Sequence, residues 1–160
     1  MEFKAFKNED AEFCFKTRSS AFIQKFYNEL GPKVVALCVN AYMPEDYISF
    51  SNKMEIFIVE ETGEKVGFVT AKRIDRDTAE IPLIYFKLDK LGLGYGKSTM
   101  EFIEEWVKTN WKEVKKIFLD TIIPLYNGDF YIKMRYNKVG ESTCTFSGNK
   151  VKAVRFEKYI

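Results

Sequence analysis

A strand, a glycine-rich loop, a helix and a second strand follow one another between residues 79 and 122, and this unit most constrains the fold. The apolar run AEIPLIYFKL leads into LGLGYG at 91–96. Met100, Ile103 and Val107 then recur on one face of a helix, and VKKIFLDTI has the composition of a buried strand. Two strands joined through a helix are parallel and cross over with a right hand. The sequence therefore predicts one parallel strand pair, with the glycine loop at the start of the connecting helix.

The segments on either side predict antiparallel strands and further helices. The run MEIFIVEETGEKVGFVTAKRI has two β-rich parts, near 54–60 and 65–74, around ETGE, and ESTCTF and VKAVRFEKYI flank SGNK in the same way. Helical spacing begins after Asn8, an expected N-cap, and stops at Gly31 and Pro32. The other expected elements are a strand at 2–7, helical segments at 33–40 and from Pro44, and a short helix at 129–138 that ends before Gly140. The expected fold class is α/β, in the form of an α+β mixed sheet with helices on its faces.

Histidine is absent from the 160 residues, and this absence excludes several kinds of chemistry. Ser-His and Cys-His nucleophile pairs, HExxH zinc sites and an imidazole general base all need it. Cys14, Cys38 and Cys144 contain no C-x-x-C pair, so neither a disulfide framework nor a metal site is expected. A reaction in this protein must use carboxylates, tyrosine, lysine, cysteine or backbone groups.

Size and charge predict a single domain that covers residues 1–160. Hydrophobic residues make up 46% of the chain and aromatic residues 16%, which is enough for a sizeable core. The net charge of +2 argues against nucleic acid as the main partner. The sequence shows no leader-like segment and no apolar run of membrane-spanning length, so we expect a cytoplasmic protein without a membrane partner.

The glycine loop permits two interpretations, and in both a phosphate binds at the start of a helix. Gly96, Lys97 and Ser98 match the end of a nucleotide-binding P-loop, and VKKIFLD, which ends at Asp120, imitates a Walker B strand. Residue 91, where a P-loop needs glycine, is leucine. A P-loop domain also builds a largely parallel sheet, whereas a single parallel unit is expected here between hairpins. A nucleotide hydrolase is therefore the weaker alternative.

The loop and its surroundings resemble the GNAT superfamily of acyl-CoA-dependent N-acyltransferases. The signature of that family is [QR]-x-x-G-x-[GA], and LGLGYG places Gly94 and Gly96 at its glycine positions. Leu91 stands where Gln or Arg is usual. The runs EKVGFVTAKR, AEIPLIYFKLD and VKKIFLD resemble the third, fourth and fifth strands of the family. The resemblance therefore covers most of the chain.

A second family motif, N-x-x-A-x-x-x-Y-x-K-x-G-F, resembles DFYIKMRYNKVGE at residues 129–141. Tyr136, Lys138 and Gly140 are in register with it. Asp129 then takes the place of the usual Asn, and Asn127 lies two residues earlier. Which of these two residues supplies the role of the amide stays open.

The resemblance implies a fold and a cosubstrate. The family has a mixed sheet of six to seven strands with about four helices, and its parallel fourth and fifth strands splay apart around acetyl-CoA. By position, the pantetheine arm would bond to the backbone of Phe86 and Leu88. Lys87, Lys90 and Lys97 would attract the cosubstrate phosphates. The pyrophosphate would bind the backbone amides of Gly92, Leu93, Gly94, Tyr95, Gly96 and Lys97.

The resemblance also implies direct transfer of an acetyl group to a primary amine in a ternary complex. Tyr136 matches the tyrosine that protonates the leaving thiolate, and aromatic packing against the sheet is the alternative role. Glu80 stands where the histone-acetyltransferase branch has its catalytic glutamate, and a solvated charge at a strand end is the alternative. Cys144 is expected to be a buried cysteine rather than an acyl carrier.

The acceptor amine is less constrained. Glu45 and Asp46 would suit a cationic amine such as a polyamine, while peptide amines, amino acids and aminoglycosides stay open. The expected partners are acetyl-CoA and an amine acceptor, with no nucleic acid, membrane or metal, and a homodimer stays open. A domain that binds acyl-CoA as a sensor or interaction module, without catalysis, is the second alternative.

Overall fold

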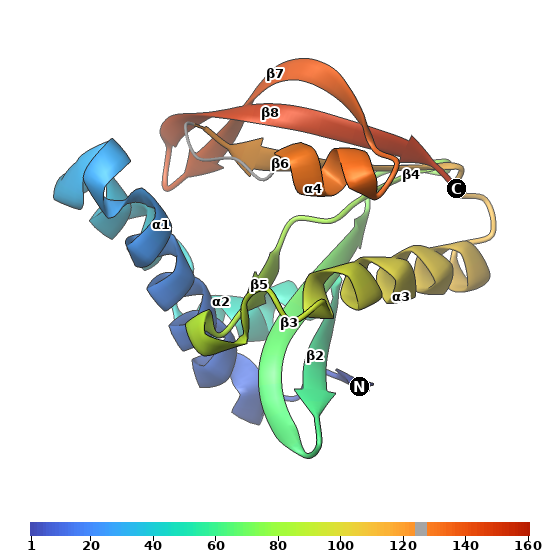
Figure 1. Cartoon of the computed structure of the whole chain (residues 1–160), viewed down its shortest axis with the longest axis horizontal. Helices are drawn as coiled ribbons and strands as arrows, with labels where there is room; N and C mark the ends of the chain where they lie inside the picture. Colours follow the sequence, from blue (N-terminus) through green and yellow to red (C-terminus); the bar gives the residue numbers. More distant parts are fainter. Residues whose placement is uncertain (124–127) are drawn as a thin grey trace.

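Within residues 1–123 and 128–160, which the computed structural model describes, the chain forms one mixed sheet of eight strands with helices on its faces (Figure 1). The strand order is β1-β2-β3-β4-β6-β8-β7, and β5 pairs with β3. The strands are β1 (Glu2–Ala5), β2 (Glu55–Glu61), β3 (Glu64–Arg73), β4 (Thr78–Glu80), β5 (Ile84–Phe86), β6 (Lys116–Ile122), β7 (Asn137–Phe146) and β8 (Asn149–Tyr159). The helices are α1 (Ala11–Asn40), α2 (Pro44–Phe50), α3 (Tyr95–Asn110) and α4 (Gly128–Lys133), with 3-10 turns η1 (Asn8–Asp10) and η2 (Leu88–Lys90).

The predicted mixed α/β class is confirmed. β2 and β3 form an antiparallel hairpin, and so do β7 and β8. The second hairpin turns at Ser147 and Gly148, whose φ angles of 46° and 80° are both positive, as a tight two-residue turn requires. β4 and β6 are parallel, and α3 lies between them in sequence, so the predicted βαβ unit is present.

The predicted fourth strand is divided into β4 and β5, and this division brings the strand count to eight. β4 pairs with β6 as far as Glu80 and Phe118, and the Ile81 N–H still donates to the Phe118 carbonyl at 2.9 Å. Pro82 follows and has no N–H to continue that ladder. Among the described strands, β5 pairs with β3 alone. The strands β5 and β6 therefore separate beyond Glu80, and Figure 1 shows them in different halves of the sheet.

The helical region before β2 is close to the prediction, apart from its start. Gly31, with φ of 78° and ψ of 160°, interrupts α1 where the helix was expected to stop. Pro44 lies in the first turn of α2, also as expected. The N-cap prediction for Asn8 is wrong, because Asn8 lies inside η1 and the Asp10 carboxylate accepts the Lys7 N–H at 2.8 Å.

The predicted helix at 129–138 is too long. α4 ends at Lys133, and Arg135 follows with φ of 66°. The Tyr136 N–H then donates back to the Tyr131 carbonyl at 2.9 Å, which is the bond of a Schellman-type helix end. Gly140 instead lies in β7, where the pairing with β8 shifts register. The chain therefore leaves the helix five residues earlier than Gly140 had suggested.

The helix α3 packs on the sheet through the apolar stripe seen in the sequence. Met100, Ile103 and Val107 are fully buried, and the Trp106 ring lies edge-on to Phe57 with centroids 5.2 Å apart. This packing positions the first turn of α3, and with it the glycine loop. In the part of the chain that the structure describes, every helix is too short or too polar to cross a membrane.

Candidate active site

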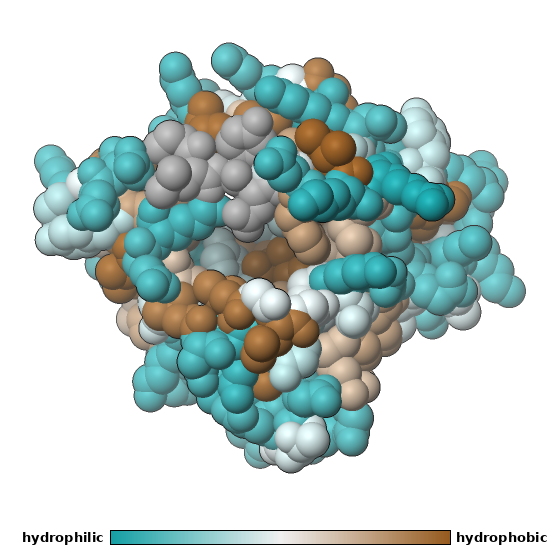
Figure 2. Space-filling view, in the orientation of Figure 1, coloured by the Kyte–Doolittle hydropathy of each residue, from teal (hydrophilic) through white to brown (hydrophobic). Residues whose placement is uncertain are grey.

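A cleft of about 940 Å³ lies where β5 and β6 separate. In Figure 2 this face of the molecule is hollowed at its centre, and hydrophobic side chains lie deep in the hollow. One wall comes from β5 and the loop before α3, and the other comes from β6, α4 and β7. The helix α1 contributes residues at one end. The cleft thus connects the glycine loop with the aromatic side chains of the first helices.

The edge of β5 that faces the cleft pairs with no other strand among the described residues. The Leu83 carbonyl accepts the Thr70 N–H at 2.9 Å, and the Lys87 N–H donates to the Val66 carbonyl at 2.9 Å. Because hydrogen-bonding direction alternates along an antiparallel strand, residues 83, 85 and 87 face β3, and Ile84 and Phe86 face away from it. The Phe86 prediction therefore agrees with this geometry. Leu88 differs, because it begins η2 and its carbonyl accepts the Leu91 N–H at 3.4 Å.

Gly67 on β3 allows β5 to lie this close. A Cβ at Gly67 would stand 2.5 Å from the Tyr85 carbonyl oxygen and would meet the Phe86 ring. A backbone carbonyl cannot move without moving its strand. The glycine is thus needed for the position of the free β5 edge.

The glycine loop lines the cleft at the start of α3. Gly92 and Gly94 have φ of 77° and 85°, and Gly94 is the N-cap of the helix. Backbone N–H groups at the start of a 16-residue helix attract anions through their own donors and through the helix dipole. Leu93 is 60% exposed and lies outside the described lining, and the prediction for its backbone amide stays a prediction. The loop residues on the cleft are Leu91, Gly92, Gly94, Tyr95, Gly96 and Lys97.

The three lysines near the loop have different surroundings. Lys87 and Lys90 bind the two oxygens of Glu64 at 2.7 and 2.8 Å, and these bonds lower the pKa of Glu64 to about 2. Lys97 is mostly exposed and lies 3.8 Å from Glu101. Lys90 and Lys97 line the cleft, whereas Lys87 faces Glu64 outside it.

Glu80 lies at the point where the two strands separate and lines the cleft. Burial raises the pKa of its carboxyl, the neighbouring Asp120 raises it further, and Lys72 and Arg155 act in the opposite direction. Asp120, also on the cleft, is held by Arg155 through bonds of 3.0 and 2.8 Å and by the Ser142 hydroxyl at 2.7 Å. Glu80 is thus a half-buried carboxyl beside a paired one, and it can accept a proton near neutral pH more readily than an ordinary glutamate.

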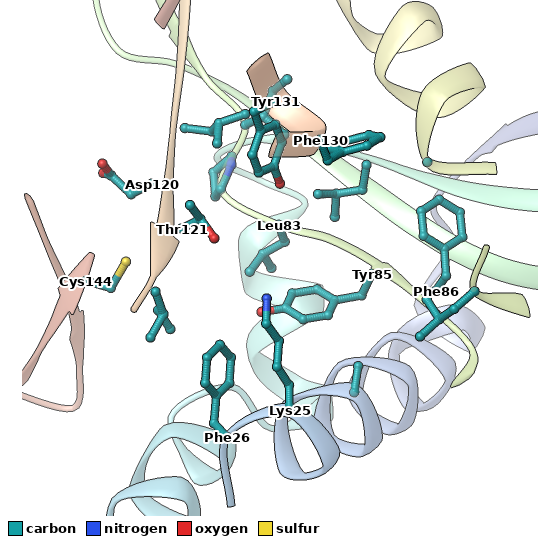
Figure 3. A pocket seen from close by; sticks show the side chains of 18 of the residues that line it. Lys25, Phe26, Leu83, Tyr85, Phe86, Asp120, Thr121, Phe130, Tyr131 and Cys144 are labelled. Carbon is teal, nitrogen blue, oxygen red and sulfur yellow. The ribbon is translucent and has the colours of Figure 1, made fainter. Parts of the chain in front are cut away.

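Tyr131, rather than Tyr136, is the tyrosine of the last helical segment that lines the cleft. Its hydroxyl points into the cleft from α4, across from Tyr85 (Figure 3). Burial raises the pKa of Tyr131, so its hydroxyl keeps its proton at neutral pH. Tyr136 is 2% exposed and faces the other way, where Lys158 Nζ lies 5.4 Å from its ring. Burial and the nearby Glu104 carboxylate raise the pKa of Tyr136.

The difference between the two tyrosines has a simple cause in the sequence. Tyr-x-Lys occurs twice, at 131–133 and at 136–138, and the motif expected for the segment has its tyrosine four residues before a glycine. Tyr136 lies four residues before Gly140, so the sequence favoured the second Tyr-x-Lys. In the structure, Arg135 takes the left-handed position that follows the helix, so Tyr131 stands four residues before this closing residue and Tyr136 enters the core. Because Arg135 is not a glycine, no signal in the sequence indicated that the helix closes there.

Of the two candidates for the family's Asn role, the structure describes Asp129, which lies outside the described lining of the cleft. Asp129 is exposed in the first turn of α4, and Phe130 and Tyr131 are the residues of that helix on the cleft. Asn127 lies outside the described residues, 1–123 and 128–160. Gly96 packs against this helix, since a Cβ there would stand 3.4 Å from Phe130.

The end of the cleft away from the glycine loop is aromatic. Its walls include Phe26, Tyr42, Tyr85 and Phe146. Arg18, fully buried, supports this wall: its guanidinium lies 4.4 Å from the Tyr42 ring centroid and donates to the Cys38 carbonyl at 3.1 Å. A residue of this kind carries no sequence signal, because only the fold shows that an arginine of a long helix lies under the cleft.

The structure also places Glu45, Asp46 and Cys144 relative to the cleft. Glu45 and Asp46 lie at the start of α2 and outside the described lining of the cleft, where Asp46 accepts the Met43 N–H at 2.8 Å. The carboxylates on the cleft are Glu80 and Asp120 instead. Cys144 lines the cleft, but burial above all raises the pKa of its thiol to about 12. A thiol with that pKa stays protonated and is a poor acyl carrier.

The whole chain was compared with protein families and with proteins of known structure. The sequence profile described as the acetyltransferase (GNAT) family matches residues 19–131. No protein of curated function matches the chain in sequence.

Several solved structures share the fold. A GCN5-related N-acetyltransferase of Rhodopseudomonas palustris superposes with a TM-score of 0.82 at 14% identity, covering 99% of this chain and 95% of its own. The PaiA N-acetyltransferase of Thermoplasma acidophilum, in complex with coenzyme A, gives 0.72 at 16% identity over 100% of both chains. A spermidine N-acetyltransferase of Vibrio cholerae gives 0.67 at 14% identity, covering 99% and 92%. At these identities the similarity shows the fold alone.

Proposed function

Because this chain belongs to the acetyltransferase (GNAT) family, we propose that it transfers the acetyl group of acetyl-CoA to a primary amine by direct attack, with Glu80 as general base and Tyr131 as general acid. The observation that carries the proposal is the cleft where β5 and β6 separate. It joins a free strand edge, an anion-binding loop, a carboxyl and a tyrosine hydroxyl in one space.

The residues present fit acetyl-CoA. The backbone groups of Phe86 on the free edge of β5 suit an arm with amide groups, which would add to the sheet as an extra strand does. The amides of the glycine loop suit a pyrophosphate at the start of α3. The complex of the Thermoplasma relative with coenzyme A supports this assignment. When bound, acetyl-CoA supplies a thioester whose carbonyl carbon is open to attack.

The chain's own groups then account for the remaining needs of the reaction. Glu80 would take a proton from the acceptor amine, directly or through water, because it lines the cleft and its pKa is raised. Tyr131 would give its proton to the leaving thiolate from the opposite wall. Holding both reactants in one cleft supplies a large part of the rate.

The donor that stabilises charge on the thioester oxygen can be assigned by elimination along residues 81–84. The Ile81 N–H binds the Phe118 carbonyl, Pro82 has none, and the Leu83 N–H binds the Thr70 hydroxyl at 2.9 Å. The Ile84 N–H faces the cleft. We therefore assign the oxyanion donor to Ile84.

The acceptor that suits this cleft is an aliphatic primary amine. Carboxylates of Glu80 and Asp120 attract an ammonium group, and the walls from Phe26, Tyr42 and Phe146 suit an apolar stem. The spermidine N-acetyltransferase among the structural relatives supports an acceptor of this class.

Acetyl-CoA should raise the melting temperature, whereas ATP with magnesium should leave it unchanged. A ligand present at a hundred times its Kd stabilises by about 2.7 kcal/mol, and each kcal/mol shifts the melting temperature of a chain this size by about 2–4 °C. Thermal melts with acetyl-CoA, CoA and ATP plus magnesium measure this directly. A shift with ATP alone would support the nucleotide hydrolase. A shift with acetyl-CoA but no thiol release with any amine would support a sensor.

The Gly67→Ala variant should bind acetyl-CoA more weakly and be less stable by about 1–3 kcal/mol, because a Cβ displaces the backbone of β5. Urea unfolding and calorimetric titration with acetyl-CoA give the two quantities. Gly148→Ala, in the β7–β8 turn, is the matched control: it strains a positive φ but lies far along the chain from β5, and its acetyl-CoA affinity should be that of wild type. Unchanged acetyl-CoA affinity in Gly67→Ala would contradict the role of the β5 edge.

A further inference from the structure

One amine of the protein itself lies in the cleft. Lys25 is on α1, which packs against β5, and it lines the cleft. Figure 3 shows its side chain extending from the helix into the space bounded by Leu83 and Tyr85. Its Nζ is 5.2 Å from the centroid of the Phe26 ring. This amine therefore lies at the end of the cleft where the proposed function places the acceptor.

The surroundings of Lys25 differ from those of its neighbour on the same helix. Lys16 is 70% exposed and pairs with Glu12 at 3.1 Å. Lys25 is half-buried, and burial lowers its pKa to about 8. At pH 8 about half of Lys25 is then a neutral amine, against about 0.3% for a lysine at its ordinary value. Only the neutral amine has a lone pair for attack.

Other charged and titratable groups face the same space from each wall. Those on the described lining are Tyr42 from the segment after α1, Glu80 from β4, Tyr85 from β5, Lys90, Tyr95 and Lys97 from the loop and α3, Asp120 from β6, Tyr131 from α4 and Cys144 from β7. The two carboxylates favour the charged form of Lys25, and the apolar and aromatic groups favour the neutral form. Both forms are thus available to it near neutral pH.

We propose that Lys25 is an acetylation site of this protein, modified by acetyl-CoA bound in its own cleft. This inference rests on the proposed function, because it uses the same bound thioester. The Lys25 ammonium first releases one proton to solvent. The lone pair of Nζ then forms a bond with the thioester carbonyl carbon, the carbon–sulfur bond breaks, and CoA leaves as a thiolate. The second proton of the nitrogen goes to that thiolate, so the products are an N-acetylated Lys25 and CoA.

Acetylation of Lys25 has a consequence for the cleft. The amide is uncharged and carries extra atoms at the end where an external amine must enter. An external amine and Lys25 therefore compete for the same acetyl group. Modification should increase when the acceptor is scarce and decrease when it is abundant.

The test is to incubate the full chain with acetyl-CoA and no amine at pH 8, and to follow intact mass and proteolytic peptides by mass spectrometry. Lys25 should gain one acetyl group at least about tenfold faster than Lys16, from proximity and neutral fraction together. At saturating acetyl-CoA the rate constant should not depend on protein concentration, as expected for transfer within one chain. An excess of CoA should slow the acetylation of Lys25 and leave the acetylation rate of Lys16 unchanged, because CoA occupies the cleft without supplying an acetyl group.

Variants make the result specific. Lys25→Arg should abolish the fast acetylation, whereas Lys16→Arg should retain it; the acetyl-CoA thermal shift verifies that Lys25→Arg is folded. An unmodified Lys25, or equal rates at Lys25 and Lys16, or insensitivity to CoA, would overturn the proposal. Thiol release with an added amine reports the proposed function separately, so a protein that acetylates amines but spares Lys25 would disprove this inference alone.

Discussion

The Tyr131→Phe variant should lose at least about 10²-fold in kcat while it keeps the fold and its affinity for acetyl-CoA, since a general acid contributes roughly that much or more. The substitution removes one hydroxyl that points into the cleft and leaves the ring in place between Phe130 and Phe156. Steady-state kinetics with free-thiol detection give kcat, and thermal melts with acetyl-CoA give binding. A higher KM with an unchanged kcat would be inconsistent with a role in protonating the thiolate.

The matched control is Tyr136→Phe, the same change five residues later. The Tyr136 hydroxyl lies in the core near Glu104 rather than on the cleft, so its removal should alter stability and leave kcat within about twofold of wild type. If kcat fell in Tyr136→Phe and stayed at the wild-type value in Tyr131→Phe, the general acid would be Tyr136 instead.

The Glu80→Gln variant should also lose about 10²-fold or more in kcat/KM, and it should lose the acidic limb of the pH profile. Glu80 acts as a base only when ionised. Because its pKa is raised by burial and by Asp120, the wild-type rate should fall as the pH falls through that raised value, above the ordinary range for glutamate. In Glu80→Gln nothing titrates at this position, so that limb should disappear. The measurement is kcat/KM against pH.

Two comparisons separate Glu80 from other causes of a pH dependence. Deprotonation of the acceptor amine also makes kcat/KM depend on pH. That part of the profile moves when an amine of different pKa is used, whereas the part that comes from Glu80 stays at the same pH. Glu157→Gln is the control variant, since Glu157 is a half-buried strand carboxylate that pairs with Lys116 outside the described cleft lining. Its pH profile should be that of wild type. An acidic limb that persists in Glu80→Gln would exclude Glu80 as the base.

The parts of the site that could be predicted from the sequence are those that depend on local chain geometry. The glycine loop and its position before an amphipathic helix follow from Gly92, Gly94 and the stripe of α3, because both are consequences of neighbouring residues. Phe86 was named from its position in the family resemblance, and the structure places it on the cleft. Glu80 was a candidate from its spacing, and the structure places it on the cleft.

What the sequence by itself determined is therefore the order of elements, the mixed sheet and the glycine loop at the start of a helix, since each arises from patterns a few residues long. Only the tertiary structure decided which side chains share the cleft. Tyr131 replaced Tyr136 there because Arg135, without being glycine, closes α4 in a left-handed conformation. Lys25, Asp120 and Cys144 line the same cleft from three distant segments, and that cleft depends on how β5 and β6 separate after Pro82. Pro82 ends the β4–β6 ladder locally, but the choice of β3 as the partner of β5 arises from contacts between strands far apart in the chain.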